Sequence, residues 1–292
     1  MKKSVSIGCV LSAAALWGCI ALFYNGLSAV GMSPIQAVLI RVSFAACMML
    51  IYILIRDPHL LKIRFRDIWL FIGTGVASLA FFNYCYFRAM DLLSPSVAAV
   101  LLYTAPAFVL LMSALFYREP ITKKKLLCFA LTLVGCFLVT EVFGGSVSSP
   151  LGILLGLGSG FGYALYTIFS VKALRRYRTE TITFYTFVAA TAAVLPLSEP
   201  LELMKTVAAF PTETVLYGGG IALFACVLPY LLYTKGLQGV SPGQASVMAT
   251  LEPVVAAVIG VSLLGDSLSV QKVLGMLLIL GGIFLLNIPK MR

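Results

Sequence analysis

The sequence predicts an all-α integral membrane protein, with ten transmembrane helices arranged as two inverted five-helix repeats around a central cavity. Three observations predict this fold: an apolar composition, ten long apolar runs and an internal repeat. Of the 292 residues, 61% are hydrophobic and only 11% are charged, too few to cover a globular surface with water-compatible groups. The apolar runs are continuous and do not alternate polar with apolar residues, which favours helices over a barrel.

Each apolar run approaches the roughly 20 residues that a helix needs to cross the hydrocarbon core. We expect spans at residues 5–24, 35–55, 67–89, 95–117, 124–142, 151–171, 181–198, 213–235, 242–264 and 270–288. The first run follows Lys2 and Lys3 as a signal peptide would, but no small-x-small cleavage site ends it, so we interpret it as a retained span. The connections are too short to hold a soluble domain.

The stretch from residue 82 to 138 recurs 147 positions later in the chain. At this offset Tyr86 matches Tyr233, and Pro106 matches Pro253. We therefore divide the chain into an N-terminal repeat, residues 1–146, and a C-terminal repeat, residues 147–292. Because each repeat contains five spans, an odd number, the second repeat must enter the membrane upside down relative to the first.

The formal charge of +10 does not indicate a nucleic-acid partner, because the basic residues cluster in short segments between the apolar runs. If both termini are cytoplasmic, 17 of the 21 Lys and Arg residues, Lys290 and Arg292 included, lie on the cytoplasmic side. Only Arg88, Lys205 and Lys272 then lie outside, and Arg41 lies within a span. This asymmetry predicts a multi-pass protein of the cytoplasmic membrane with cytoplasmic N- and C-termini.

Polar and aromatic residues occupy matching positions in the two copies. Asn83 and Tyr86 correspond to Tyr230 and Tyr233, and the spacing i, i+3 places each pair on one helix face. Such a face within an apolar span is better satisfied by a wet cavity than by lipid. The alternative is that these residues mark helix ends or hydrogen bonds between helices.

The next span of each copy contains a proline near its middle. Tyr103 and Pro106 correspond to Thr250 and Pro253. A mid-span proline removes a main-chain hydrogen bond and kinks the helix, so matched prolines predict hinges beside a central site, although passive bends would look the same.

Two charged residues lie within spans. Glu252 is costly when charged in hydrocarbon, so it must be neutral or have a partner, and Arg41 is the one basic candidate. We expect Arg41 to pair with Glu252 or to anchor a substrate carboxylate, unless its long side chain reaches the interface instead. Trp17 and Tyr163, near the middle of the first span of each half, would stack on a substrate, although packing alone would also explain these rings.

The sequence contains no catalytic set, no metal-ligand spacing among its seven cysteines and no nucleotide-binding motif, so we expect a non-enzyme without metal or cofactor. Its expected partners are a small-molecule substrate and the lipid bilayer; the oligomeric state is left open.

Each copy of the repeated unit contains a Pro-containing span, an acidic turn, at residues 118–122 or 265–269, and a Gly-rich last helix, and the first span contains the sequence Leu16-Trp17-Gly18. With these features the chain resembles the EamA family of the drug/metabolite transporter superfamily. The resemblance implies ten helices around a central cavity and export of small metabolites, chiefly amino acids, some of them aromatic, by a secondary-active or facilitative transporter working by alternating access.

In that view ten residues contact the substrate: Trp17, Arg41, Asn83, Tyr86, Tyr103, Tyr163, Tyr230, Tyr233, Thr250 and Glu252. The alternative function is export of organic cations or drugs, attracted by Glu252. An intramembrane enzyme or a scaffold is the third hypothesis.

Overall fold

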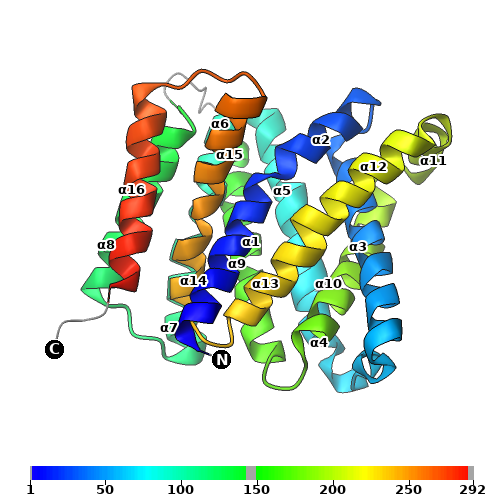
Figure 1. Ribbon diagram of the computed structural model, residues 1–292, viewed down its shortest axis with the longest axis horizontal. Helices are drawn as coiled ribbons and strands as arrows, with labels where there is room; N and C mark the ends of the chain where they lie inside the picture. Colours follow the sequence, from blue (N-terminus) through cyan, green and yellow to red (C-terminus); the bar gives the residue numbers. More distant parts are fainter. Residues whose placement is uncertain (1, 143–148, 289–292) are drawn as a thin grey trace.

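The computed structural model describes residues 2–142 and 149–288, and all regular structure in these ranges is helical (Figure 1). In the first half, α1 (Lys3–Gly18) and α2 (Ile20–Ala29) form the first span and α3 (Pro34–Arg56) the second. The third comprises η2 (Phe65–Asp67), α4 (Ile68–Ile72), the π-helical η3 (Gly73–Ala80) and α5 (Phe81–Leu92). The fourth is α6 (Pro95–Leu102) with α7 (Ala105–Tyr117), and the fifth is α8 (Lys123–Val139). A short turn, η1 (Pro58–Leu61), joins the second and third spans.

The second half repeats this order. It contains α9 (Pro150–Ala173), α10 (Thr179–Val194) with η4 (Leu195–Leu197), and a span built from α12 (Pro211–Ile221), the π-helical η5 (Ala222–Val227) and α13 (Leu228–Gly236). The last two spans are α14 (Pro242–Ala249) with α15 (Leu251–Leu263), and α16 (Val270–Asn287).

The predicted spans are confirmed. Within the described ranges, nine helical segments are long and apolar enough to cross a membrane, and α8, with 17 residues, is the tenth span. The predicted boundary between the repeats, at residues 146 and 147, lies outside the described residues, as do Lys290 and Arg292. The sequence analysis missed α11 (Pro200–Ala209), because a ten-residue helix in a connection is too short to register as a span.

Several spans begin at a Ser-Pro pair. The hydroxyl groups of Ser33, Ser94, Ser149 and Ser241 each accept a hydrogen bond from the main-chain N–H three residues later. The following proline fits the first helical position, where its missing N–H costs nothing. These caps fix where the helices start, and Ser94 and Ser241 do so at matching positions of the two repeats.

The last helices of the two halves, α8 and α16, lie side by side at one edge of the molecule (Figure 1). Gly135 of α8 lies against Gly275 of α16, and the repeat-related pair, Gly282 and Cys128, forms the matching contact. The missing side chains allow the two backbones to approach closely, which is how helices associate in lipid.

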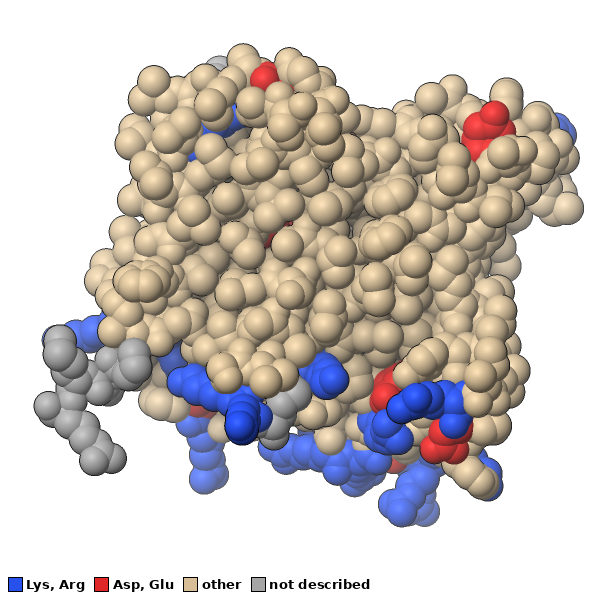
Figure 2. Space-filling model, in the orientation of Figure 1, with Lys and Arg blue, Asp and Glu red and all other residues tan. Residues whose placement is uncertain are grey.

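Basic residues gather at one end of the helix bundle. Figure 2 shows the blue Lys and Arg atoms along the lower end, where the N-terminus lies, and few at the upper end. We call the lower end, which carries Lys3, Arg56, Arg118 and the loop that follows α9, the basic end. The other end is called the opposite end.

The contact between α8 and α16 yields a first prediction. A Cβ added at Gly135 would lie 2.6 Å from Ile279 Cγ1 and 2.7 Å from the Gly275 carbonyl oxygen, so Gly135→Ala forces the helices apart. We expect a loss of about 1–3 kcal/mol in the free energy of unfolding, seen as a lower thermal midpoint in detergent. In Gly281→Ala, also in α16, the added Cβ has no neighbour within 4 Å, so its midpoint should match the wild type. Equal midpoints for the two variants would contradict the close packing.

Candidate functional site

A cavity of about 300 Å³ lies among helices of both halves. It is lined by eight of the ten residues predicted to contact substrate: Trp17, Arg41, Asn83, Tyr86, Tyr103, Tyr163, Tyr230 and Glu252. The other two line smaller adjoining pockets, Thr250 beside Glu252 and Tyr233 beside Tyr230. The fold thus brings the predicted residues together from seven spans.

Other lining residues were missed by the sequence analysis. Tyr24, Phe82, Phe87 and Met90 also face the cavity. Phe82 lies one helical turn before Tyr86, so the i, i+4 spacing could have identified it. Tyr24, Phe87 and Met90 lie near the opposite end, which shows that the cavity extends from mid-membrane in that direction.

Aromatic rings form one wall of the cavity. The centroid of the Trp17 ring lies 5.4 Å from that of Tyr230 and 6.1 Å from that of Tyr163, and both contacts have edge-to-face geometry. Tyr166 contacts Tyr230 in the same way, at 4.8 Å. Because these contacts fix the ring orientations, the wall has a defined shape before any ligand binds.

Arg41 lies in the cavity wall rather than at the membrane interface. Its side chain is 9% exposed, and its Nη2 donates a 2.8 Å hydrogen bond to Oδ1 of Asn83. Asn83 in turn donates to the Leu79 carbonyl oxygen at 2.7 Å, which fixes the orientation of the amide. The Nε of Arg41 is buried and has no hydrogen-bond partner among the described residues. The guanidinium therefore keeps donor capacity for a further acceptor.

The predicted pairing of Arg41 with Glu252 is wrong in its direct form. The salt bridges among the described residues do not include one between these two side chains. Asn83 takes the place of Glu252 as the partner of Arg41, because it faces α3 from the adjacent α5. Arg41 and Glu252 nevertheless line the same cavity, so it holds both signs of charge.

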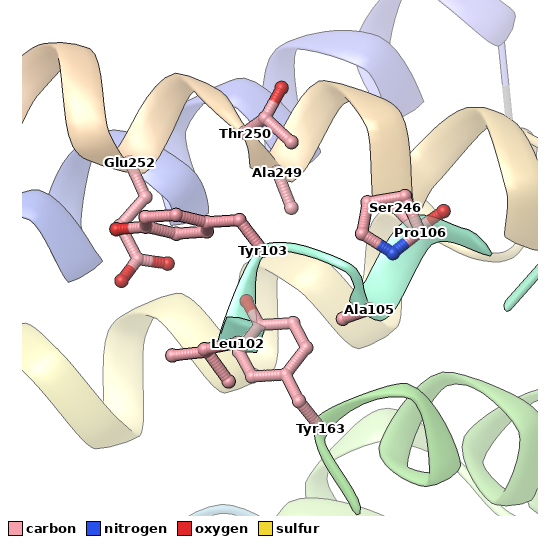
Figure 3. Close-up of a pocket in the computed structure, with 9 residues that line it drawn as sticks. All are labelled: Leu102, Tyr103, Ala105, Pro106, Tyr163, Ser246, Ala249, Thr250 and Glu252. Carbon is pink, nitrogen blue, oxygen red and sulfur yellow. The ribbon is translucent and has the colours of Figure 1, made fainter. Parts of the chain in front are cut away.

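Glu252 lies in the first turn of α15, directly after the helix break at Thr250. The positive end of the α15 dipole favours a carboxylate at this position. Glu252 lines a small pocket with Tyr103 and Tyr163 (Figure 3). The matching residue of the first repeat is Ala105, so only the second half contributes an acidic group.

Both proline-containing spans are interrupted beside this pocket. The break between α6 and α7 falls at Tyr103 and Thr104, and the break between α14 and α15 falls at Thr250. Pro106 and Pro253 lie in the first turns of the segments that follow. The kinks are thus full interruptions of the helix. The hinge role of the prolines stays a prediction.

The cavity is closed toward the basic end by hydrogen-bonded, buried side chains. The hydroxyl groups of Tyr166 and Thr234 lie 2.6 Å apart, and those of Thr167 and Tyr233 lie 2.8 Å apart. All four side chains are buried. Both bonds join α9 to α13, within the second half.

The matching tyrosines Tyr86 and Tyr233 have different surroundings. Tyr233 is 1% exposed and bonded to Thr167, whereas Tyr86 is half-buried and lines the cavity. One tyrosine therefore belongs to the hydrogen-bonded closure, and its counterpart lines the cavity.

Glu119, in the turn between α7 and α8, joins the two halves at the basic end. Its side chain is 9% exposed and accepts hydrogen bonds from Ser113 Oγ at 2.6 Å, Lys125 Nζ at 2.7 Å and the Gly243 main-chain N–H at 3.2 Å. Gly243 lies at the start of α14, in the second half. Burial raises the pKa of Glu119, but the hydrogen bonds from Lys125 and Ser113 more than offset this, so its pKa lies below the ordinary value.

In the matching turn at the opposite end, the acidic residue is exposed to the surface. Asp266, the counterpart of Glu119, is exposed, and Gly260 replaces the hydroxyl donor Ser113. The local geometry is otherwise retained: the Asp266 N–H bonds the Gly260 carbonyl oxygen, as the Glu119 N–H bonds that of Ser113. Lys272, the counterpart of Lys125, pairs with Glu141 instead.

The described residues contain no group of three or more His, Cys, Asp or Glu side chains placed to hold a metal ion. The cavity lining offers aromatic surfaces, several hydroxyl groups, one guanidinium and one carboxylate for contact with a ligand.

Known proteins resemble this chain over most of its length. An uncharacterized transporter of Archaeoglobus fulgidus is 28% identical over 211 residues, which is 71% of this chain and 74% of the relative. The uncharacterized transporter YdfC of Bacillus subtilis is 26% identical, covering 97% of this chain and 91% of its own. The uncharacterized inner membrane transporter YicL of Salmonella typhimurium is 25% identical, covering 97% and 95%. A solved crystal structure shares the fold, with a TM-score of 0.78 at 17% identity over 97% of this chain and 96% of that one.

The model of the EamA-like transporter family matches the chain twice, at residues 5–141 and 150–288. The two matches cover the two five-helix halves, in agreement with the fold. The chain belongs to the EamA-like transporter family.

Proposed function

We propose that the protein exports small zwitterionic metabolites, amino acids first among them, by alternating access and without ATP. The observation that carries the proposal is that repeat-related residues differ in their hydrogen bonding between the two ends. The side chains of Tyr233 and Glu119 are hydrogen-bonded at the basic end, while those of Tyr86 and Asp266 form no such bond to the residues that the structure describes. In a protein built from inverted repeats, exchanging the conformations of the halves closes the open end and opens the closed one.

The two charges in the cavity support a zwitterionic substrate. The unpartnered Nε of Arg41 suits a substrate carboxylate, and Glu252 suits an ammonium group. The aromatic wall formed by Trp17, Tyr163 and Tyr230 would pack against an apolar or aromatic side chain. An organic cation, the alternative substrate, would meet Glu252 favourably but would be repelled by Arg41.

The concentration of Lys and Arg at one end supports an orientation with the basic end in the cytoplasm. Both termini would then be cytoplasmic, and the structure would represent the state open to the outside. The inner-membrane location given in the name of the Salmonella relative supports placement in the cytoplasmic membrane.

Reconstituted protein tests the substrate class. We expect saturable uptake of labelled amino acids into liposomes, with Glu252→Gln abolishing uptake or its response to a pH gradient. Glu213→Gln, at a half-buried carboxylate of α12 that does not line the cavity, makes the same chemical change and should leave uptake unaltered. Unchanged uptake and pH response in Glu252→Gln would exclude a coupling role for this residue.

Arg41→Gln separates the two substrate classes. Loss of a buried charge partner typically costs about 2–5 kcal/mol, so the KM for an amino acid should rise at least about tenfold. Uptake of a lipophilic cation should not weaken, because the repelling charge has been removed. A carrier of organic cations would show no inhibition by amino acids and no loss of transport in this variant.

Glu119 gives a pH-dependent prediction. Because its pKa is lowered by folding, its contribution to stability is fully present above the unfolded pKa, about 4.3, and is lost as the pH falls through the folded pKa. We expect Glu119→Gln to lower the thermal midpoint at pH 7, and the difference from wild type to shrink below about pH 4.3. A difference that grows as the pH falls would contradict the assigned role, and Glu213→Gln again serves as the control.

A further inference from the structure

A second polar pocket lies at the basic end, away from the central cavity. It has a volume of about 380 Å³ and is lined by Arg66, Asp67, Trp69, Leu70, Lys172, Arg175 and Arg176. We call this the basic pocket. Its residues come from η2 and α4 of the first half and from α9 and the loop that follows it in the second half, so the pocket lies at a junction between the halves.

The single carboxylate of the basic pocket is already in use. Asp67 is buried, forms a salt bridge with Arg176 and accepts a 2.7 Å hydrogen bond from the Tyr177 hydroxyl group. Arg66 and Lys172 form no hydrogen bond or ion pair through their side chains within the described ranges, and Arg175 only stacks on the Tyr117 ring, 5.6 Å from its centroid. Within the described residues, three cationic side chains therefore line the pocket without an ion-pair partner.

The basic pocket borders a surface that faces the lipid. Trp69 is 50% exposed and packs edge-on against Phe169, while Ile72 and Val76, at i+3 and i+7 from Trp69, continue an exposed apolar stripe along α4 and η3. An exposed Trp next to Arg and Lys is typical of the headgroup level of a bilayer. The cations therefore lie at the depth of a lipid phosphate, and the apolar stripe lies at the depth of the acyl chains.

A preference for basic residues at the cytoplasmic side explains the sign of the charge at this end, but not its arrangement. It does not require three cations around one pocket, nor a buried Asp67 that fixes Arg176 at its rim. Arginine and lysine clusters between helices at a membrane surface have the chemistry that binds anionic headgroups.

We propose that the basic pocket binds the phosphate headgroup of an anionic phospholipid, with Arg66, Lys172 and Arg175 as its ligands and the acyl chains along Trp69, Ile72 and Val76. The lipid would bridge η2 and α4 of one half to α9 of the other, alongside the Asp67–Arg176 salt bridge. Bound lipid therefore stabilises the contact between the halves at the basic end.

The test compares lipids of matched acyl chains on the purified full-length protein. Native mass spectrometry from a neutral detergent measures bound phosphatidylglycerol and phosphatidylcholine, and the thermal midpoint is read in parallel. We expect phosphatidylglycerol to bind more tightly and to raise the midpoint. The triple variant Arg66→Gln, Lys172→Gln, Arg175→Gln should weaken this binding at least about tenfold, since three cations that attract the anionic headgroup are lost.

A matched control removes the same charge from the same end. Lys2→Gln, Lys3→Gln, Lys123→Gln changes three exposed residues outside the basic pocket and should keep the preference for phosphatidylglycerol. Equal loss of binding in both triple variants, or equal binding of the two lipids, would overturn the proposal. A midpoint shift by inorganic phosphate equal to that by phosphatidylglycerol would assign the site to a soluble anion instead. If the first triple variant does not fold, Arg66→Gln and Lys172→Gln singly give the same comparison.

Discussion

The cost of unpaired polar groups in hydrocarbon governs this structure. Main-chain groups must be bonded within helices, and charges must be paired, shielded or moved to the ends of the bundle. Several exceptions within the described spans gather at one place. Four features border the central cavity: the helix breaks at Tyr103–Thr104 and at Thr250, and the charged side chains of Arg41 and Glu252. Irregular backbone and buried charge are tolerated there because a cavity can hold water or a ligand, and for the same reason they mark the site.

The contact between α8 and α16 follows the repeat symmetry, whereas the polar contacts around the cavity differ between the two ends of the bundle. The glycine contacts between α8 and α16 obey the repeat symmetry, since Gly135 with Gly275 has its counterpart in Gly282 with Cys128. The polar contacts around the cavity do not obey it. A close-packed contact without polar partners is equally good in either conformation of the halves, whereas a hydrogen bond at only one end distinguishes the two conformations.

Much of this fold could be predicted from the sequence, because apolar runs and Ser-Pro caps are local signals. The 147-residue offset also pointed to six of the ten predicted site residues, since matched polar positions in both copies favour a shared site. Contacts between helices could not be predicted from the sequence. The bond from Arg41 to Asn83, which replaces the expected pair with Glu252, depends on how α3 meets α5. The π-helical segments η3 and η5, which lie at matching positions just before Asn83 and Tyr230, left no recognisable mark in the sequence.

The positions where the two copies differ are as informative as those where they agree. Glu252 stands opposite Ala105, so the carboxylate in the cavity is a property of one half. Ser113 stands opposite Gly260, so the hydroxyl that holds Glu119 at the basic end has no equivalent that could hold Asp266 at the opposite end. Under the proposed mechanism, exchanging the halves would therefore form a weaker closure at the opposite end. The substitution at this one pair of positions favours the state seen here, closed at the basic end, before any substrate binds.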